Sequence, residues 1–426
     1  MPGQDLDPST LIPRVLSRYS PVVVDHAEGI YVWDIHGERW TDFTSGIAVT
    51  NTGHCHPRVV AAIREQAGKI IHAQANILAH EPMMRLAQLI TETMPPSLNQ
   101  VFFSNSGAEA IEGAIKLAKI ATRRPAIISF RGAFHGRTHL AMALTSSRAK
   151  VRAHYEPLVP SIYRAPYPNP FRNPYNLPPD KAEDAYFADL EALFETEVLP
   201  DDVAAIIIEP MLGEGGYVVA PKRYMQRLRR LCDEHGILLI VDEIQTGVGR
   251  SGTMWAFEQF GIVPDIVTVA KGIASGLPLS AVVASRDLMD RWAPGAHGGT
   301  YGGNAVACAA GVATFEVMRD EDLPGNAARI GQFLMAQLRE MQSEFPVIGD
   351  VRGMGLMIGV EFVTPDGAPN GAAASEVIRR AQERRTLLIS AGTSDQVIRV
   401  IPPLVINQQQ AEEFLDVFAD AVKSVS

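Results

Sequence analysis

The sequence is poor in cysteine and contains no long apolar run. Its 426 residues include three cysteines, Cys55, Cys232 and Cys308, which are odd in number and far apart. This pattern predicts reduced thiols in a cytoplasmic protein rather than a disulfide framework. No stretch approaches the ~20 apolar residues that a membrane helix needs, and residues 1–7 are polar and acidic, unlike a signal peptide. We therefore expect no membrane partner.

Positive charge is also in short supply. Lysine and arginine total 38, against 48 aspartate and glutamate residues, which gives a formal net charge of −10. Nucleic acid and anionic membranes are therefore not expected as main partners. The chain is 426 residues long, and 46% of its residues are hydrophobic, which is ordinary for a globular protein. It is long enough for two domains, or for one large and one small domain.

Three short apolar runs stand in the middle of the chain, and each ends on a side chain able to do chemistry. The runs are 205–208 before Glu209, 237–241 before Asp242 and 265–270 before Lys271. None alternates apolar with polar residues, so each is typical of a parallel strand buried on both faces. Ligands bind beyond the carboxyl ends of such strands. We therefore expect two carboxylates and one amine to converge on one crevice.

A lysine at the end of a buried strand has a specific chemical meaning. Desolvation lowers its pKa, and a neutral amine attacks carbonyl groups to form a Schiff base. The usual partner in that chemistry is pyridoxal 5′-phosphate (PLP), whose ring nitrogen stays protonated only against a carboxylate such as Asp242. On this stretch alone, a surface lysine and a helix-capping aspartate are equally good interpretations of Lys271 and Asp242.

A candidate anion site lies upstream. Residues 101–103 predict a buried strand, and Ser106 and Glu109 follow in capping-box spacing. A helix N-terminus delivered by a strand directs free N–H groups at a ligand, and a phosphate would suit it. A plain capped helix is the more common reason for this spacing.

A second glycine-flanked motif follows the strand predicted at 126–130. Phe134 offers a flat ring for stacking, and Arg137 offers a guanidinium for a carboxylate. Core packing for Phe134 and a surface ion pair for Arg137 are the alternatives.

The remaining elements are predicted from periodicity and turn residues. We expect a β-hairpin over 30–43, a helix from Pro57, a long extended loop over the eight prolines of 157–179, helices over 181–196, 326–344 and 407–424, and strands at 280–284, 355–362 and 397–401. The G-x-G-x-x-G match at 247–252 is rejected as a dinucleotide motif because four residues separate it from the strand. His54, Cys55 and His56 have no second ligand cluster, so no metal site is expected.

In this order, the motifs resemble those of the class III PLP-dependent aminotransferases over nearly the whole chain. The matching stretches are 51–54, 104–110, 134–138, Glu209-Pro210 with 213–216, 241–247, 270–272 and 300–304. The resemblance implies an α/β protein of PLP-dependent transferase fold type I. Its large domain, with a mostly parallel central sheet, would cover 51–309. The arm 1–50 and the segment 310–426 would form a smaller α+β domain.

The resemblance also implies where PLP is held. Lys271 is expected to be the Schiff-base lysine, and Asp242 the partner of the pyridine nitrogen. Phe134, followed by His135, is expected to stack on one face of the ring, and Ile244 to press on the other.

The phosphate and ring-hydroxyl contacts follow in the same way. Ser106, Gly107 and Ala108 are expected to hold the phosphate, helped by Thr300 of the partner subunit, and Gln245 to reach the ring hydroxyl oxygen. The family works as a homodimer with active sites at the interface, and a tetramer is possible.

Within the family, the sequence is similar to the 4-aminobutyrate aminotransferases. That likeness assigns the distal carboxylate of an ω-amino acid to Arg137 and the α-carboxylate of 2-oxoglutarate to Arg399. Glu209 is expected to pair with Arg399 and release it when needed, and Ile47 to line the pocket. Residues 74–76, Gln-Ala-Asn, stand where those enzymes often have an aromatic residue, which implies a wider pocket.

The expected reaction is a ping-pong transfer of an amino group from an ω-amino acid to a 2-oxo acid. The alternatives on the same scaffold are an amino-acid racemase and a transaminase of ornithine or simple amines. All begin when a base, expected to be Lys271, removes a proton next to the amine.

Overall fold

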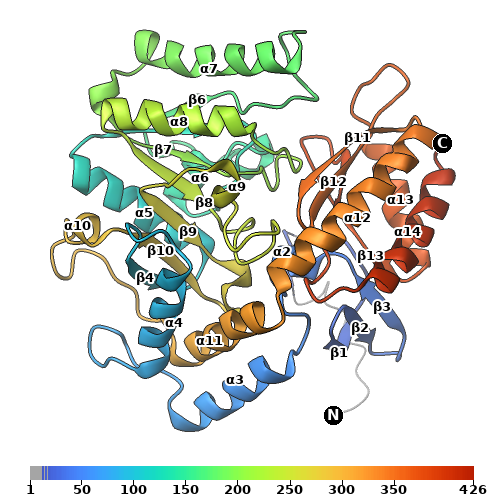
Figure 1. Cartoon of the computed structure of the whole chain (residues 1–426), viewed down its shortest axis with the longest axis horizontal. Helices are drawn as coiled ribbons and strands as arrows, with labels where there is room; N and C mark the ends of the chain where they lie inside the picture. Colours follow the sequence, from blue (N-terminus) through green and yellow to red (C-terminus); the bar gives the residue numbers. More distant parts are fainter. Residues whose placement is uncertain (1–11, 14, 17) are drawn as a thin grey trace.

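A seven-stranded sheet forms the centre of the larger part of the molecule, in the order β4-β10-β9-β8-β7-β5-β6. The computed structural model describes residues 12, 13, 15, 16 and 18–426 (Figure 1). The strands are β4 (Gln100–Ser104), β5 (Ala126–Phe130), β6 (Ile162–Ala165), β7 (Val203–Ile208), β8 (Leu238–Asp242), β9 (Ile266–Val269) and β10 (Ser280–Ala284). All neighbours from β9 to β6 are parallel, whereas β10 is antiparallel to β4 and β9. The predicted mostly parallel sheet is confirmed.

Helices cover both faces of this sheet, which is why its strands read as unbroken apolar runs. The helices of this part are α3 (Pro57–Lys69), α4 (Glu81–Glu92), α5 (Gly107–Thr122), α6 (His139–Leu144), α7 (Pro179–Thr196), α8 (Lys222–His235), α9 (Phe257–Phe260), α10 (Arg286–Met289) and α11 (Ala305–Asp320). Ile207 and Ile240 pack in the cluster that includes α5 and α6. Ile206 and Leu239 pack in the cluster that includes α8 and α9. Burial of each such side chain contributes about 1.5–3 kcal/mol.

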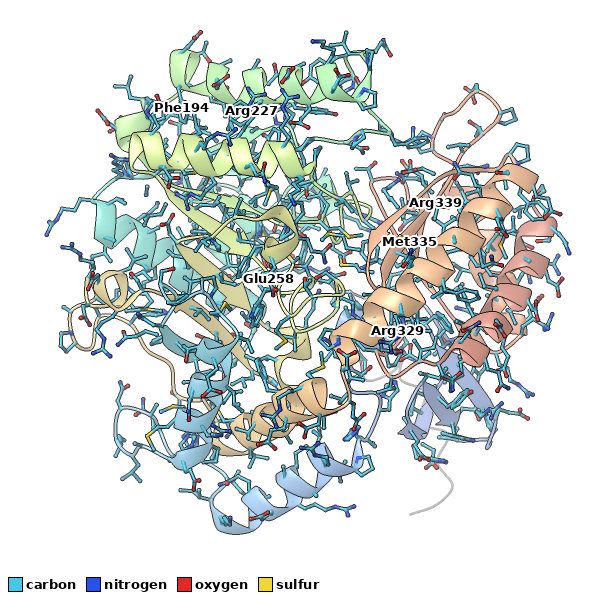
Figure 2. The ribbon with its side chains drawn as sticks, viewed as in Figure 1. Phe194, Arg227, Glu258, Arg329, Met335 and Arg339 are labelled. Carbon is cyan, nitrogen blue, oxygen red and sulfur yellow. The ribbon has the colours of Figure 1, made fainter. Side chains whose placement is uncertain are left out.

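The helices α7 and α8 form an outer layer over the sheet. Figure 2 shows Phe194 of α7 and Arg227 of α8 between these two helices. The Cζ atom of Arg227 lies 3.9 Å from the centroid of the Phe187 ring, and its Nη1 atom lies 2.8 Å from Asp184 Oδ1. A cation–π contact and an ion pair therefore join the layer.

The proline-rich segment 157–179 is not the continuous loop that its composition predicts. Residues 162–165 form β6, which pairs in parallel with β5 at the edge of the sheet. Pro160 and Pro166 flank this short strand. Proline has no N–H to donate to a neighbouring strand. It is tolerated beside an edge strand because such a strand pairs on one side only. The expectation of a loop was wrong here, since a four-residue edge strand leaves little apolar signal.

The N-terminal and C-terminal segments together build the smaller α+β part (Figure 1, blue and orange to red). One sheet has the order β1-β2-β3-β13, and the other has the order β11-β12-β15-β14. Their elements are β1 (Val24–Glu28), β2 (Tyr31–Asp34), β3 (Arg39–Asp42), β11 (Ile348–Met354), β12 (Met357–Phe362), β13 (Thr386–Leu387), β14 (Ile389–Ala391), β15 (Val397–Val400), α12 (Leu323–Glu344), α13 (Gly371–Glu383) and α14 (Gln408–Lys423). Because β3 pairs in parallel with β13, the two ends of the chain share one sheet. The predicted hairpin is confirmed as β2 and β3.

The helix predictions hold, with small shifts at their ends. Asn407 caps α14 in a capping box with Gln410, as its sequence position predicts. Helix α11 crosses residue 310 and packs against α3 and α4, so the second expected domain boundary falls inside a continuous helix. The division at 50 and 309 stays a prediction. None of the helices in the part of the chain that the structure describes has the length and apolar character that crossing a membrane requires.

The rejected glycine motif 247–252 lies where the two parts of the molecule meet. A Cβ atom at Gly249 would fall 2.2 Å from Met318 Cε, and a Cβ atom at Gly355 would fall 2.4 Å from Ser251 C. Arg250, which is fully buried between them, donates to Leu356 O at 3.1 Å and to Pro402 O at 2.5 Å. Its Nη2 atom also donates to Asn51 Oδ1 at 2.9 Å. The absence of side chains at Gly249 and Gly355 thus leaves room for neighbouring atoms, and the hydrogen bonds of Arg250 hold these segments together.

We expect Arg250→Met to lower the free energy of unfolding by about 3 kcal/mol or more, because it leaves three buried oxygen acceptors without their donor. The measurement is urea denaturation at fixed protein concentration. Arg329→Met is the control, since Arg329 of α12 is 65% exposed (Figure 2) and its pair with Asp322 spans 3.3 Å. That change should cost under about 1 kcal/mol. Equal midpoints for both variants would contradict the assignment.

Candidate active site

The three reactive side chains of the central strands converge. Strands β7, β8 and β9 are neighbours in the sheet and run parallel. Glu209, Asp242 and Lys271, which follow or end these strands, line one cavity of ≈ 420 Å³. This is the geometry expected at the carboxyl edge of a parallel sheet.

The N-terminus of α5 forms one end of the cavity. Ser106 Oγ accepts the N–H of Glu109, and the Glu109 carboxylate accepts the N–H groups of Asn105 and Ser106 at 2.7 and 2.9 Å. The predicted capping box is confirmed. The first-turn N–H groups of Gly107 and Ala108 have no intrahelical acceptor and line the cavity. This helix N-terminus therefore has the geometry that suits an anion.

Two apolar side chains form walls of the cavity. Phe134 and Ile244 both line it. A Cβ atom on Gly107 would lie 2.9 Å from Ile244 Cδ1, so this glycine is needed for Ile244 to take its place. Gln245 lines the same space, and its Oε1 accepts the hydroxyl of Tyr217 at 2.8 Å.

Asp242 is buried and held by three donors. His135 Nδ1 lies 2.7 Å from Asp242 Oδ2, while the Ile244 N–H and the Thr268 hydroxyl donate to Oδ1 at 3.0 and 3.3 Å. Burial lowers the pKa of His135, but the hydrogen bond and charge of Asp242, with the charge of Glu209, outweigh it and raise the pKa overall. The Asp242 carboxylate therefore favours the charged form of the His135 ring.

Glu209 is a buried carboxyl group beside this pair. Burial raises its pKa to about 7, with a further contribution from Asp242, while His135 opposes the shift. Its two oxygens accept the N–H groups of Phe134 at 2.8 Å and Gly213 at 2.9 Å. Both oxygens are thus occupied by the backbone of the loops around the cavity.

Lys271 begins a short 3₁₀ turn (Lys271–Ala274) directly after β9, and its φ of 50° is left-handed. Such a conformation costs free energy in a residue other than glycine and is characteristic of functional sites. Burial lowers the pKa of its amine to about 8. Glu214 opposes this shift, whereas Arg399 adds to it. A substantial fraction of the amine is therefore neutral near physiological pH.

Arg399 is paired, but with a different glutamate from the one expected. Its Nη1 and Nη2 atoms lie 2.6 and 2.9 Å from the two carboxylate oxygens of Glu214. The expected pairing with Glu209 is wrong, because Glu209 is engaged with the backbone of Phe134 and Gly213. Glu214 lies further along the loop, on the side where β15 brings Arg399.

Four predicted residues do not line the cavity of their own chain: Arg399, which reaches it only through Glu214, and Arg137, Ile47 and Thr300. Arg137 is exposed, with its Cζ atom 5.7 Å from the centroid of the Phe134 ring. Ile47 is 36% exposed and lies in a left-handed turn, with φ of 66°. Thr300 is exposed in the glycine-rich loop. Their assigned roles, like that of segment 74–76, stay predictions.

Sequence reasoning missed several residues of the site. Glu214 stood in a quoted motif, but the strand-ending Glu209 was chosen instead. Its flanking glycines at 213, 215 and 216 were the available signal. Tyr217, which orients Gln245, and the segment 276–279, which lines the cavity, gave no signal because only tertiary packing brings them there.

Comparison with known proteins agrees with this geometry. The family model of class III aminotransferases matches residues 15–422. The chain is 43% identical to a 5-aminovalerate aminotransferase of Pseudomonas aeruginosa, over 96% of this chain and 95% of the relative. It is 40% identical to a 4-aminobutyrate aminotransferase of Escherichia coli, with 96% of each chain covered. The structure of a taurine:2-oxoglutarate aminotransferase from Bifidobacterium kashiwanohense, solved with PLP and glutamate, matches with a TM-score of 0.89 and 31% identity, over 95% of this chain and 93% of the other.

A mostly parallel sheet whose strand ends gather a lysine, an aspartate and an anion site defines a PLP-dependent enzyme of fold type I. The chain belongs to the class III aminotransferases.

The residues present fit PLP. The carboxylate of Asp242 suits a protonated ring nitrogen, the walls made by Phe134 and Ile244 suit a flat ring, and the N-terminus of α5 suits a phosphate. The amine of Lys271 suits an aldehyde. When bound, PLP supplies the electron sink for breaking bonds at the amine-bearing carbon.

We expect Lys271 in cofactor-free protein to be acylated by acetic anhydride with half-maximal reactivity near pH 8, because the neutral amine appears as pH rises through a pKa of about 8. Peptide mapping by mass spectrometry measures this. Lys69 is the control, since its hydrogen bond to Glu65 raises its pKa, so it should react only at higher pH. Parallel pH profiles for the two lysines would contradict this account.

Proposed function

We propose that this aminotransferase moves the amino group of an ω-amino acid of the 4-aminobutyrate or 5-aminovalerate type to a 2-oxo acid such as 2-oxoglutarate. The names of the two relatives at 43% and 40% identity support this substrate class. The reaction has two half-reactions in one pocket. An ω-amino acid has no carboxylate next to its amine, whereas glutamate and 2-oxoglutarate have a carboxylate at that position.

The observation that carries the proposal is the buried pair of Arg399 and Glu214. Arg399 is 1% exposed, so an unpartnered guanidinium facing the apolar carbons of an ω-amino acid would be costly. Glu214 supplies an internal counter-ion, with both oxygens on the two Nη atoms. Burial opposes ionisation of Glu214, but the charge and hydrogen bonds of Arg399 lower its pKa overall.

The same pair can open for a 2-oxo acid. A planar guanidinium binds any carboxylate through two parallel hydrogen bonds, so the α-carboxylate of 2-oxoglutarate can replace Glu214 on Arg399. Glycines at 213, 215 and 216 surround Glu214 and give its backbone freedom to move aside. Arg137, beside the Phe134 ring, needs no such exchange, because both substrates present a distal carboxylate to it.

Lys271 has the properties expected of the base that removes the proton next to the substrate's amine. With a pKa of about 8, its Nζ atom can accept a proton from the carbon next to the amine and return it. Glu214 raises the pKa of this amine and Arg399 lowers it. When the substrate's carboxylate takes the place of Glu214 on Arg399, one negative charge near Nζ is exchanged for another.

We expect Arg399→Ala to lower kcat/KM for 2-oxoglutarate by about 30- to 1,000-fold, the equivalent of roughly 2–4 kcal/mol for a lost charge-assisted pair. The ω-amino acid half-reaction should change by less than about fivefold. Glu214→Gln should show the reverse preference, because Arg399 then faces the donor without its counter-ion. Single-turnover rates of each half-reaction measure both effects.

Equal losses in both half-reactions for Arg399→Ala would overturn the exchange. Incubation of single enantiomers of alanine without a 2-oxo acid separates the proposal from the racemase alternative. Loss of optical purity under those conditions would favour the racemase, since racemisation needs no acceptor.

We further propose that the chain works as a homodimer. A set of large apolar side chains is exposed next to Thr300, comprising Ile70, Ile71, Ile77, Leu78, Met84 and Tyr301. Hydrogen bonds from Asn304 Nδ2 to Ile71 O and between His80 Nε2 and Gly303 O, both 2.9 Å, hold these two segments together. Exposed apolar clusters of this kind are typical of protein–protein interfaces. A cytoplasmic location is proposed from the free thiols of the three cysteines.

Ile77→Asp should convert the dimer into monomers, because it places a charge in the apolar cluster. Sedimentation equilibrium measures this, and PLP retention after dialysis should fall if Thr300 serves the partner's site. Ile35→Asp is the control, since Ile35 is 59% exposed in the distant β2–β3 turn. The proposed interface would be contradicted if the wild-type protein sedimented as a monomer, or if Ile77→Asp still sedimented as a dimer.

A further inference from the structure

The turn between β14 and β15 is attached to the large domain at two points. Arg148, in the loop after α6, binds the Asp395 carboxylate through two hydrogen bonds, with Nη1–Oδ2 at 2.9 Å and Nη2–Oδ1 at 2.5 Å. The Gly392 N–H donates to Glu214 O at 3.0 Å. The Arg148 side chain is 15% exposed and that of Asp395 is 42% exposed, so the bidentate pair is shielded on its arginine side only.

Asp395 is in turn connected to the guanidinium of Arg399. The hydroxyl of Ser390 donates to Asp395 Oδ1 at 2.7 Å, and the carbonyl of Ser390 accepts Arg399 Nε at 2.8 Å. Ser390 is 6% exposed, so water does not readily replace these bonds. A continuous series of hydrogen bonds therefore runs from Arg148 through Asp395 and Ser390 to Arg399.

This series uses only one edge of the guanidinium. The Nε atom is held by Ser390, whereas both Nη atoms face Glu214. An exchange of carboxylates on the Nη atoms requires that the plane of the guanidinium stay fixed while its partner leaves, since bidentate binding depends on orientation. Ser390 supplies that fixed point only if the turn that carries it stays in place.

Arg148 fixes the carboxylate of the turn from outside it. Asp395 and Gly392 are both left-handed, with φ of 56° and 85°, a conformation that aspartate and glycine adopt more readily than other residues. The two hydrogen bonds from Arg148 bind both oxygens of Asp395, so this large-domain side chain sets the orientation of the carboxylate that receives the Ser390 hydroxyl.

We propose that Arg148 and Asp395 are positioning residues that hold Arg399, through Ser390, in the orientation that receives the α-carboxylate of the 2-oxo acid. This inference rests on the proposed function, since it assigns that carboxylate to Arg399. It predicts an effect on one substrate class only. An ω-amino acid leaves Glu214 in place, and Glu214 itself then orients the guanidinium.

The test compares steady-state constants of the holoenzyme for Arg148→Met and Asp395→Asn. Each should raise the KM for 2-oxoglutarate about tenfold, with kcat and the KM for the ω-amino acid within about twofold of wild type. The dissociation constant of glutarate, a dicarboxylate without an oxo group, should rise by a similar factor in calorimetric titration. The double variant should be no worse than the stronger single variant, because both remove the same contact.

Arg384→Met and Asp420→Asn are matched controls. They break another Arg–Asp pair of the small domain, at 3.0 Å and with both side chains more than half exposed, and should leave every constant unchanged. Ser390→Ala keeps both charges and removes only the hydroxyl link, and should raise the KM for 2-oxoglutarate about threefold. Arg148→Lys should restore part of the wild-type KM, since it keeps the charge without the bidentate geometry.

Equal increases in KM for both substrates, or no increase in Arg148→Met and Asp395→Asn, would overturn the inference. Arg399→Ala distinguishes this from a failure of the proposed function. If Arg399→Ala selectively weakens 2-oxoglutarate while the two positioning variants do not, only the inference falls. If Arg399→Ala has no selective effect, the proposed function falls with it.

Discussion

The burial of charged groups at the carboxyl edge of a two-sided parallel sheet is the constraint on which the site depends. Strands β7, β8 and β9 are covered on both faces, so the side chains at their ends enter a space with little water. Desolvation there lowers the pKa of Lys271 to about 8 and raises that of Glu209 to about 7. The Asp242 carboxylate is held by the His135 ring, the Ile244 N–H and the Thr268 hydroxyl. One packing arrangement thus gives neighbouring groups different protonation behaviour.

The junction of the two parts of the chain places an arginine, Arg399, beside the loops that follow the large sheet. The second sheet of the small part, through β15, carries Arg399 to the loop that holds Glu214. Gly355 lets its backbone approach that of residues 250–252, and the hydrogen bonds of Arg250 to Leu356 and Pro402 join the two parts there. The proposed substrate contacts therefore depend on this junction, whereas the proposed cofactor contacts come mostly from the part of the chain that holds the large sheet. Such a boundary would suit the proposed exchange of partners on Arg399, because Arg399 and Glu214 are held by different parts of the chain.

Several errors in the sequence-based expectations share one cause. The strand β6 was taken for loop, because a short edge strand between prolines carries little periodic signal. The strand β12 was predicted, but β11 was not. The turn at Gly355 joins the two into one hairpin. Glu209 was paired with Arg399 because it ends a strand, yet its oxygens accept backbone N–H groups. The two short strands were missed because their pairing, not their local pattern, defines them, and the partner of Arg399 was misassigned because a local pattern does not identify partners.

The amino-acid sequence alone predicts the buried parallel strands, the capped helix at Ser106 and the convergence of Lys271, Asp242 and Glu209. Those features follow from local apolar patterning, from capping spacing and from the rule that parallel strands end at one edge. Tertiary structure alone decided that Glu214 faces Arg399, that Tyr217 orients Gln245 and that Arg148 reaches Asp395. These pairs are separated by 28 to 247 positions. The contacts of Arg399 and of Asp395 depend on how the two parts of the chain pack together, and that of Tyr217 depends on the packing of two loops within one part. A local pattern carries no information about either kind of packing.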